Sequence, residues 1–397
     1  MIVLVVNAGS SSLKFQLFDM ATRAVRASGA FERIGVDGRY KYTPAGRETI
    51  KVDFPMKAHD DAITELMRLL TDKDVGVIRD MSEIDAVGHR VLNAGEKITE
   101  SVIVNDYVKD VIRECIPIGP LHNPANLMGI ECFEKALPGV KQVAVFDTAF
   151  HQTMPPESYL YAIPYEYYEK YKVRKYGFHG TSHRYVSGRA LEILGDPKAK
   201  IVTCHLGNGS SVAAVDGGKC VDTSMGLTPL EGLPMGTRSG NLDPAVISFI
   251  AEHENMTATE VVNMLNKQSG VLGISGVSSD FRDLEEAANG GNKRAQIALR
   301  MFERCVEKYI GAYACEMGGV DAIVFTAGIG ENNRIMRENI VRDIAFLGVK
   351  IDSEKNAHPG EDCIVSTPDS KVKVLVIPTN EELVIAMDTE RLVKAAR

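Results

Sequence analysis

Side chains able to contact phosphate gather in the segment VNAGSSSLKF, residues 6–15, between two apolar runs. Asn7, Gly9, three consecutive serines and Lys14 make up this segment. A turn rich in glycine and hydroxyls surrounds an anion with N–H and O–H donors, and a lysine adds a full positive charge. An ordinary polar hairpin tip is the alternative interpretation. No G-x-x-x-x-G-K-[ST] sequence occurs, so a P-loop is excluded and any phosphate is held in another way.

A second candidate for nucleotide binding is VFTAGIGENNR, residues 324–334. An apolar strand runs into a glycine turn and then into a helical pattern that begins near Asn332 and Asn333. A strand end that meets a helix N-terminus favours phosphate binding through its geometry and the helix dipole. The dinucleotide fingerprint is incomplete, because Gly328 and Gly330 lack a third glycine at position 333.

Three charged residues follow apolar runs or stand in glycine-rich loops. Asp147 ends the run QVAVF, and a carboxylate at the mouth of a buried strand is either a helix cap or a metal or catalytic ligand. Arg90 follows IDAVGH, and Arg238 lies in PMGTRSGNLDP. An arginine in such a loop is either solvated or grips a carboxylate or phosphate with its planar fork.

One histidine and two acidic residues complete the set. His179 in KYGFHGTSH is either a structural histidine or a donor to a transferring phosphoryl group. Glu381 and Glu382 follow the apolar run that ends in VIP and open a helical pattern. Acidic residues favour helix N-termini in general. The functional interpretation is that one of them completes a Mg²⁺ shell, since magnesium takes few carboxylates and keeps waters.

The elements that position these residues alternate between strands and helices, so the sequence predicts an α/β fold. Strands are expected at residues 2–6, 12–18, 84–88, 142–146, 201–206, 211–215, 321–326 and 372–377. Helices are expected at residues 58–70, 125–137, 182–194 and 293–318.

A short sequence near the start of the 397-residue chain recurs near its middle, and we call this pair of similar segments the internal echo. IVLVVNAGSSSLKF at residues 2–15 is matched by VTCHLGNGSSVAAV at residues 202–215, so that Gly9 corresponds to Gly209. The chain is also longer than a single core usually grows. We therefore expect two domains of like fold, each presenting a polar turn to a cleft between them. A chance similarity of two G-S-S turns is the alternative.

Composition excludes several classes of protein. The formal net charge is −8 and no block of five or more basic residues occurs, which argues against a nucleic-acid partner. The seven cysteines are scattered without zinc-ligand spacing and are interpreted as reduced thiols. No signal sequence or membrane span is found, so no membrane partner and a cytoplasmic location are expected.

The segments taken together resemble the acetate kinase, or acetokinase, family over nearly the entire chain. The ordered motifs are NAGSSSLKF, GHRV, GPLHNP, FDTAFH, RKYGFHGTSH, HLGNGSS, GLTPLEGLPMGTRSG, SSDFRD, AGIGEN and PTNEEL. No single motif is decisive, but their order makes the resemblance specific.

The resemblance implies the sugar kinase, heat-shock 70 and actin superfamily, with two ribonuclease-H-like domains and an active site in the cleft between them. We assign residues 1–150 and 383–397 to the N-terminal lobe and residues 151–382 to a nucleotide-binding and dimerising lobe. The implied reaction is reversible phosphoryl transfer from ATP to acetate, giving ADP and acetyl phosphate. The implied cofactor is Mg²⁺, or Mn²⁺ in its place, and the implied assembly is a homodimer.

Residue roles come from the same resemblance. Asp147, His179 and Arg238 are implied as catalytic, Asn7 and Glu381 as metal ligands, and Arg90 as the acetate-binding arginine. The methyl pocket is implied at Leu92, Leu121, Phe178 and Pro229. The nucleotide contacts are implied at Lys14, His205, Leu206, Gly207, Asn208, Gly209, Asp280, Phe281, Arg282, Gly328, Ile329, Gly330, Glu331 and Asn332.

Several alternatives stay open at this point. The family often has V-H-G-G-E after GHRV, whereas this chain has Leu92, Asn93, Ala94, Gly95 and Glu96. Leu92 is larger than valine, which predicts a smaller pocket and discrimination against propionate and butyrate. Within the carboxylate kinases, a propionate or butyrate kinase is the nearest rival. Outside them, the rivals are a chaperone or filament protein that uses ATP as a switch and a catalytically silent homologue.

Acetate is already ionised at neutral pH, so the nucleophile needs no general base. We therefore expect Asp147 to fix the metal and its waters or to orient an arginine.

Overall fold

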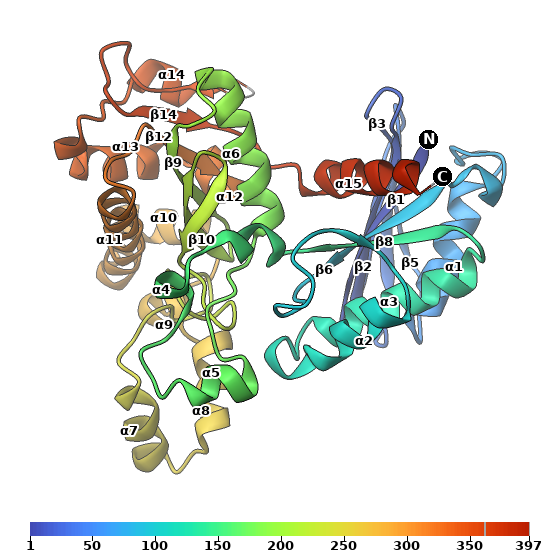
Figure 1. Ribbon diagram of the computed structural model, residues 1–397, viewed down its shortest axis with the longest axis horizontal. Helices are drawn as coiled ribbons and strands as arrows, with labels where there is room; N and C mark the ends of the chain where they lie inside the picture. The colour runs from blue at the N-terminus through green and yellow to red at the C-terminus, as the bar shows by residue number, and fades with distance from the viewer. Residues whose placement is uncertain (361–362, 397) are drawn as a thin grey trace. The chain divides into compact units, whose positions relative to one another are not determined.

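The structure is a computed structural model that describes residues 1–360 and 363–396. Two compact units make up the chain (Figure 1). Unit 1 comprises Met1–Ala149 and Asn380–Arg397, and unit 2 comprises Phe150–Thr379. The sequence-based division assigned residue 150 to the first lobe, whereas Phe150 lies in unit 2, and it assigned residues 380–382 to the second lobe. The structure places them in unit 1 because the Asn380 side chain accepts a hydrogen bond from the Leu383 backbone and caps the last helix.

Unit 1 is built on a mixed sheet with the strand order β5-β4-β3-β2-β1-β6-β8-β7. The strands β1 and β2 form the expected hairpin, with Asn7 opposite Lys14 and Gly9 opposite Ser12. Parallel pairing of β1 with β6 and of β6 with β8 continues the sheet. The strand bounds are Ile2–Gly9, Ser12–Asp19, Ala24–Glu32, Arg39–Pro44, Ile50–Asp53, Ala86–Val91, Val102–Ile103 and Lys141–Phe146 for β1 to β8.

Helices cover both faces of the central strands in unit 1. Val3 and Val5 of β1 pack with Ile385 of α15 (Glu381–Ala395). The alternate residues Leu4 and Val6 belong to a core that includes α1 (His59–Leu70) and α3 (Asn123–Ala136). The helix α2 (Asp106–Glu114) packs on α3. Alternation of apolar residues toward two buried faces explains the unbroken apolar run at residues 2–6.

Unit 2 has a six-stranded mixed sheet in the order β11-β10-β9-β12-β14-β13. The antiparallel hairpin of β9 and β10 is followed by parallel pairing of β9 with β12 and of β12 with β14. The bounds are Lys200–Leu206, Ser210–Asp216, Lys219–Thr223, Ala322–Thr326, Cys363–Ile364 and Lys373–Val376 for β9 to β14.

The central strands of unit 2 are also covered on both faces. Ile201 packs with Val186 of α6 (Gly180–Leu194), whereas Val202 packs with Phe302 of α11 (Lys293–Glu316). The other helices are α4 (Pro156–Tyr159), α5 (Glu166–Tyr171), α7 (Ala245–Glu254), α8 (Ala258–Lys267), α9 (Gly270–Ser275), α10 (Phe281–Asn289), α12 (Ala327–Asn332), α13 (Arg334–Asp343) and α14 (Ser353–Ala357). Short 3₁₀ turns occupy Met81–Glu83, Ile116–Ile118, Ala149–Thr153 and Ala345–Leu347.

The two sheets share one strand order. In unit 1, β3-β2-β1-β6-β8-β7 follows the same sequence of pairings as β11-β10-β9-β12-β14-β13 in unit 2. The equivalent strands β1 and β9 carry the two members of the internal echo. The predicted α/β class with a duplicated fold is confirmed. No described helix has the length and apolar character needed to cross a membrane.

Candidate active site

In unit 1 the candidate residues meet at the carboxyl ends of parallel strands. Asn7 lies near the end of β1, Arg90 near the end of β6, and Asp147 directly after β8. The backbone N–H of Asp147 donates to the carbonyl of Val91, which ties the two strand ends together. Ligand sites in α/β sheets lie at this edge, because the chain turns away there and leaves room for polar side chains.

Arg90 and Asp147 form a two-bond ion pair. Nε of Arg90 donates to Oδ1 of Asp147 at 3.0 Å, and Nη2 donates to Oδ2 at 2.7 Å. The Asp147 side chain is 1% exposed and that of Arg90 is 30% exposed. The negative charge of Asp147 raises the pKa of the Arg90 guanidinium. The pair therefore holds a permanently charged guanidinium in one orientation, with its other edge available to an anion.

Glu381 lies beside this pair in the first turn of α15. Its Oε2 is 3.9 Å from Nε of Arg90. Burial raises the pKa of Glu381 to about 7, with Arg90 acting in the opposite direction and Asp147 adding to the increase. Burial thus favours the protonated form of Glu381, whereas a bound cation would favour the carboxylate.

A cavity of about 650 Å³ in unit 1 brings the predicted residues together. Asn7, Lys14, Arg90 and Glu381 all contribute to its wall, as does Glu382. The cavity continues over the open face of β2 to β5, where it is lined by Gln16, Ser28, Lys41, Thr43, Thr49 and Lys51.

Three exposed lysines form a row across that face. Lys14 pairs with Ala30, Ala30 with Lys41, and Lys41 with Lys51 on four successive strands. Residues paired across antiparallel strands point to the same face. The lysine row, defined by these three residues, therefore extends positive charge outward from Asn7 and Arg90.

Leu92 and Leu121, the predicted methyl-pocket residues of unit 1, differ in burial. Leu92 is buried, and a Cβ atom built on Gly119 would lie 3.1 Å from its Cδ2. Leu121 is 61% exposed. Asn126, which the sequence interpretation missed, accepts a hydrogen bond from the Leu92 backbone and donates to the carbonyl of Ala8. It therefore fixes the ends of β6 and β1 against each other.

In unit 2, His179 and Arg238 face the same glycine. A Cβ atom on Gly209 would lie 3.5 Å from Nε2 of His179 and 3.6 Å from Nη1 of Arg238. His179 is the N-cap of α6 and has φ +54°, a left-handed conformation that is uncommon for a residue with a side chain. Strain of this kind is concentrated at functional sites, and here it sets the position of the imidazole.

Arg238 is held by its own loop. Nη1 donates to the carbonyl of Pro229 at 3.0 Å, so two of the predicted residues are in contact. Burial lowers the pKa of Arg238. The loop also approaches the nearby turn closely, because a Cβ on Gly236 would come within 1.8 Å of Asn208 Oδ1. A larger residue at position 236 would require the Asn208 side chain to move.

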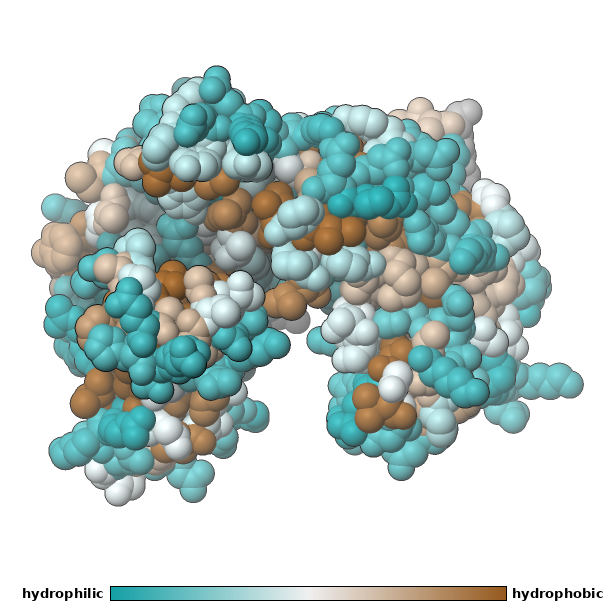
Figure 2. All heavy atoms as spheres, turned by 90° about the horizontal axis from the view of Figure 1, so that it is seen from below, coloured by the Kyte–Doolittle hydropathy of each residue, from teal (hydrophilic) through white to brown (hydrophobic). Residues whose placement is uncertain are grey.

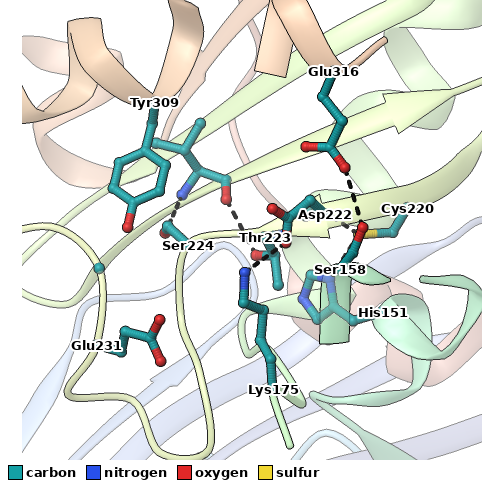
Figure 3. Close-up of polar contacts among 12 residues, drawn as sticks. His151, Ser158, Lys175, Cys220, Asp222, Thr223, Ser224, Glu231, Tyr309 and Glu316 are labelled. Carbon is teal, nitrogen blue, oxygen red and sulfur yellow. Dashed lines mark hydrogen bonds and ion pairs between the residues drawn. The ribbon is translucent and has the colours of Figure 1, made fainter. Parts of the chain in front are cut away.

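Phe178 is buried and its carbonyl lies 2.8 Å from Nε2 of His151. Nδ1 of His151 lies 3.1 Å from Sγ of Cys220. Asp222, two residues after Cys220, forms an ion pair with Lys175 at 2.7 Å (Figure 3). Burial raises the pKa of the Cys220 thiol, so the sulfur keeps its proton. This polar layer supports the backbone that leads into His179.

His205 lies on the other side of His179. The two imidazole rings are stacked with centroids 4.1 Å apart. Nδ1 of His205 lies 2.8 Å from the Ser182 hydroxyl, which accepts a hydrogen bond from Thr379. His205 is therefore a buried ring on which the His179 ring stacks.

A second cavity, of about 710 Å³, lies wholly within unit 2. Eight predicted nucleotide contacts line it: Gly207, Asn208, Asp280, Phe281, Arg282, Gly328, Ile329 and Asn332. The wall also contains Glu285 and Ile335, which the sequence interpretation did not include, and Ser279, Asn333 and Arg334, which lie in the quoted motifs but not in the implied list of nucleotide contacts. Ala327, at the start of α12, has φ +64° and turns the chain from β12 into this wall.

Other predicted nucleotide residues lie outside the wall of this cavity. Leu206 is buried in the core on β9. The Glu331 carboxylate accepts hydrogen bonds from the Ala327 and Thr379 backbones at 2.8 and 3.1 Å. Its side chain thus holds the turn, and Gly330 packs closely against Phe325.

No group of three or more histidine, cysteine or carboxylate side chains suited to a metal is found among residues 1–360 and 363–396. The oxygen donors Asn7 and Glu381 nevertheless line one cavity. One amide and one carboxylate fit Mg²⁺, which usually takes one or two protein carboxylates together with water and substrate phosphates.

Each unit thus has a cavity and cationic side chains suited to binding anions, and comparison with known proteins shows the family. A family model described as the acetokinase family matches residues 2–387. The chain is 60% identical to the acetate kinase of Thermoanaerobacterium thermosaccharolyticum and 58% identical to that of Caldanaerobacter subterraneus, in both cases over 100% of each chain.

Two solved structures of similar proteins lead to the same family. The acetate kinase of Porphyromonas gingivalis superposes with a TM-score of 0.95 at 49% identity, covering 99% of each chain. A propionate kinase from Francisella tularensis gives a TM-score of 0.93 at 42% identity, covering 98% of this chain and 99% of that one. The chain belongs to the acetokinase family, which confirms the resemblance, and it is a phosphotransferase with a carboxyl group as acceptor.

Proposed function

We propose that the protein transfers the γ-phosphoryl group of ATP to acetate, reversibly and by direct in-line transfer, giving ADP and acetyl phosphate. The observation that carries this proposal is the ion pair of Arg90 and Asp147 at the strand ends of unit 1. It presents one oriented guanidinium in a cavity that Glu381 and Asn7 also line. A cation so placed suits a small carboxylate that attacks a phosphate.

Arg90 binds the attacking carboxylate. Its Nε and Nη2 atoms contact Asp147, so the edge formed by Nη1 and Nη2 grips the acetate oxygens. The positive charge also offsets repulsion between the carboxylate and the γ-phosphate. Positioning and electrostatics supply most of the acceleration in phosphoryl transfer, because its transition state is loose.

Asp147 is a positioning residue for Arg90 in this proposal. Acetate is ionised at neutral pH, so no proton has to be removed from the nucleophile. The two short hydrogen bonds to Arg90 and the 1% exposure of Asp147 support an orienting role.

Mg²⁺ is the proposed cofactor, with Asn7 and Glu381 as the residues that hold it. When bound, it supplies positive charge to the phosphate oxygens. Burial disfavours the charged form of Glu381, and a cation bound to this carboxylate would offset that cost.

His179 and Arg238 donate to the transferring phosphoryl group, and Lys14 contributes positive charge from unit 1. The orientation of His179 Nε2 and Arg238 Nη1 toward Gly209 supports this role. The nucleotide occupies the unit 2 cavity lined by Gly207, Asp280 and Gly328.

The acetate methyl group contacts Leu92, Leu121, Phe178 and Pro229. Leu92 is the buried member of this set in unit 1, so it limits the length of the acid. A propionate kinase has nearly the same fold, so residue size in the pocket, and not the fold, decides the preference for acetate.

The protein acts as a homodimer in the cytoplasm. Figure 2 shows apolar residues among hydrophilic ones on one face of the molecule. In unit 2, α7 has no buried residue, and its Phe249 is 62% exposed. Tyr165 and Tyr171 near α5 are more than half exposed as well. An apolar helix surface that no other element of the unit buries favours a subunit interface. All seven cysteines are free, which suits a reducing compartment.

Trapping with hydroxylamine tests the proposal, because acyl phosphates give hydroxamates. The protein is incubated with MgATP and acetate, propionate or butyrate in parallel. We expect acetyl hydroxamate to form fastest. Equal rates with all three acids contradict the pocket assignment, and absence of hydroxamate with every acid contradicts the proposed reaction.

A further inference from the structure

A chain of buried hydrogen bonds runs from His179 into the interior of unit 2. Nδ1 of His179 lies 2.9 Å from the Ser211 hydroxyl, which lies 2.7 Å from Nε2 of His183. Nδ1 of His183 lies 2.7 Å from Thr203 Oγ1, and that hydroxyl donates to the carbonyl of Ala213 at 3.5 Å. Ser211, His183 and Thr203 each have 0% exposure, so water does not compete for these bonds.

The direction of the chain follows from its last member. A carbonyl oxygen only accepts, and that of Ala213 lies 3.5 Å from the Thr203 hydroxyl, so the chain makes one contact more when the hydroxyl hydrogen of Thr203 points to Ala213 than when it points to His183. The Thr203 oxygen is then the acceptor for Nδ1–H of His183. Burial, with the neighbouring His151 and His205, lowers the pKa of His183 well below its usual value, so this ring is neutral and has one N–H.

The directions of the remaining bonds follow from this choice at Thr203. Nε2 of His183 has no hydrogen and accepts from the Ser211 hydroxyl. The Ser211 oxygen in turn accepts from Nδ1–H of His179. If the chain ran in the opposite direction, Ser211 would donate to Nδ1, and a neutral His179 would carry its hydrogen on Nε2.

We propose that Ser211 is a positioning residue, oriented by His183 and Thr203, that keeps the hydrogen of neutral His179 on Nδ1. Nε2 is then the nitrogen that gains and loses a proton. It donates to the transferring phosphoryl group only when the ring is cationic. This last step rests on the proposed role of His179, whereas the location of the hydrogen does not.

The groups around His179 couple its protonation to the arrival of an anion. Arg238 and Nε2 face the same glycine, the His205 ring is stacked at 4.1 Å, and His183 lies behind Ser211. The Arg238 charge opposes a second positive charge on His179. The negative charge of a phosphoryl group bound at Nε2 favours the cationic form of His179, and the proton that the ring gains comes from solvent.

Hydrogen bonds with Thr223 and Ser224 fix the backbone directly after Ser211. The next residue, Val212, donates its backbone N–H to the Ser224 hydroxyl at 2.9 Å and accepts from the Thr223 hydroxyl at 3.1 Å. Figure 3 shows the side chains of Thr223 and Ser224 that make these bonds. The sequence echo marks Ser211 as the counterpart of Ser11 but does not reveal this chain.

Nitrogen NMR of the full-length protein, labelled with ¹⁵N-histidine, tests the proposal directly. His179→Gln identifies the signals, and spectra are recorded at a pH where the ring is neutral. We expect the hydrogen on Nδ1 in the wild type and a majority on Nε2 in Ser211→Ala. A hydrogen on Nε2 in the wild type overturns the proposal.

Two further variants separate this role from a merely structural one. Thr203→Val removes the acceptor for His183 at a distance from His179, and we expect the share of His179 with hydrogen on Nε2 to rise. An unchanged tautomer in Thr203→Val overturns the chain. Ser187→Ala, a buried serine elsewhere on α6, is the matched control and leaves the tautomer as in the wild type.

The pH profile of kcat gives the functional readout. Above the pKa of a required cationic acid, activity falls roughly tenfold per pH unit. We expect this alkaline decline in the wild type and in Ser211→Thr, which keeps the hydroxyl, and a decline of less than about threefold per unit in Ser211→Ala. The same steep decline in Ser211→Ala overturns the proposal.

Failure of the proposed function has a different signature. If His179 does not contact the phosphoryl group, His179→Gln retains kcat within about twofold. The NMR result is then unaffected, and only the link between the tautomer and catalysis is lost.

Discussion

The two units have the same strand order but present different chemistry at the ends of their strands. Unit 1 brings two carboxylates, those of Asp147 and Glu381, within ion-pair distance of one guanidinium, that of Arg90. Unit 2 brings together stacked imidazoles and hydroxyls, with one partly buried arginine, Arg238, beside them. One topology therefore supports both a site governed by charge and a site governed by hydrogen-bond direction.

The contrast follows from what surrounds each strand end. In unit 1, the first turn of α15 adds acidic side chains beside Arg90, so opposite charges compensate each other. In unit 2, the start of α6 adds His179 and His183 one turn apart, and small hydroxyls of β9 and β10 fit between the rings. We expect substitutions in unit 1 to act through charge and those in unit 2 through proton location.

The largest effect is expected for Asp147→Asn. The amide keeps nearly the same shape but no longer compensates or orients the Arg90 guanidinium. We expect kcat to fall roughly 1,000-fold, measured by the hydroxamate assay at saturating substrates.

Asp388→Asn is the matched control, since Asp388 is a buried carboxylate of the same unit that accepts from Ser101. It alters the melting temperature but leaves kcat within about twofold. Activity of Asp147→Asn within tenfold of the wild type, with unchanged dependence on Mg²⁺ concentration, contradicts the central place of charge in unit 1.

Leu92→Val tests whether unit 1 holds the acceptor. Removing one methylene from the wall lengthens the space available to the acid, so the ratio of kcat/KM for propionate to that for acetate is expected to rise about tenfold. Leu137→Val removes the same group from the core of unit 1 and serves as the control. An unchanged ratio in Leu92→Val assigns chain-length selection to other residues.

The charge of unit 1 also predicts a pH dependence of stability in the metal-free protein. Burial raises the pKa of Glu381 from about 4.5 in the unfolded chain to about 7 in the folded one. Between these values the folded state holds more protons than the unfolded state. The contribution of Glu381 is therefore complete below about pH 4.5 and is lost as the pH rises through about 7.

Urea denaturation between pH 5 and pH 8 measures this effect. The free energy of unfolding of the wild type is expected to fall over that range. That of Glu381→Gln is expected to fall less. Identical pH dependence in the two proteins shows that Glu381 does not titrate in this window. Added Mg²⁺ is expected to stabilise the wild type most at the upper end of the range.

The smallest effect is expected for the lysine row. Neutralising Lys41 and Lys51 together lowers the local positive potential without touching Arg90 or Asp147. We expect kcat/KM for MgATP to fall about threefold at low ionic strength and the difference to vanish at high salt. The double variant of Lys73 and Lys135, exposed lysines elsewhere in unit 1, is the control. An equal decrease in both double variants attributes the effect to net charge alone.

Much of the central architecture could be predicted from the sequence, because buried strands such as residues 142–146 are unbroken apolar runs. The strands β3 to β5 were missed for the opposite reason. Residues 50–53 of β5 are mostly exposed, so that strand contains no apolar run. In β4, buried residues alternate with more exposed ones, so it contains no unbroken apolar run either.

The site could be predicted as a set of residues but not as a network. Arg90 and Asp147 each follow an apolar strand, yet their contact depends on β6 and β8 being parallel neighbours. The chain from His179 to Thr203 depends on the register of β9 and β10 and on the rotation of α6. His183, four residues after His179, was the available signal, since residues at this spacing lie on one helix face.

The most direct test of the account is the stereochemistry of transfer from ATP made chiral at the γ-phosphorus. If the carboxylate oriented by Arg90 attacks the nucleotide phosphate itself, a single displacement occurs and the configuration of acetyl phosphate is inverted. Retention of configuration would require a phosphorylated side chain as an intermediate and would contradict the proposal.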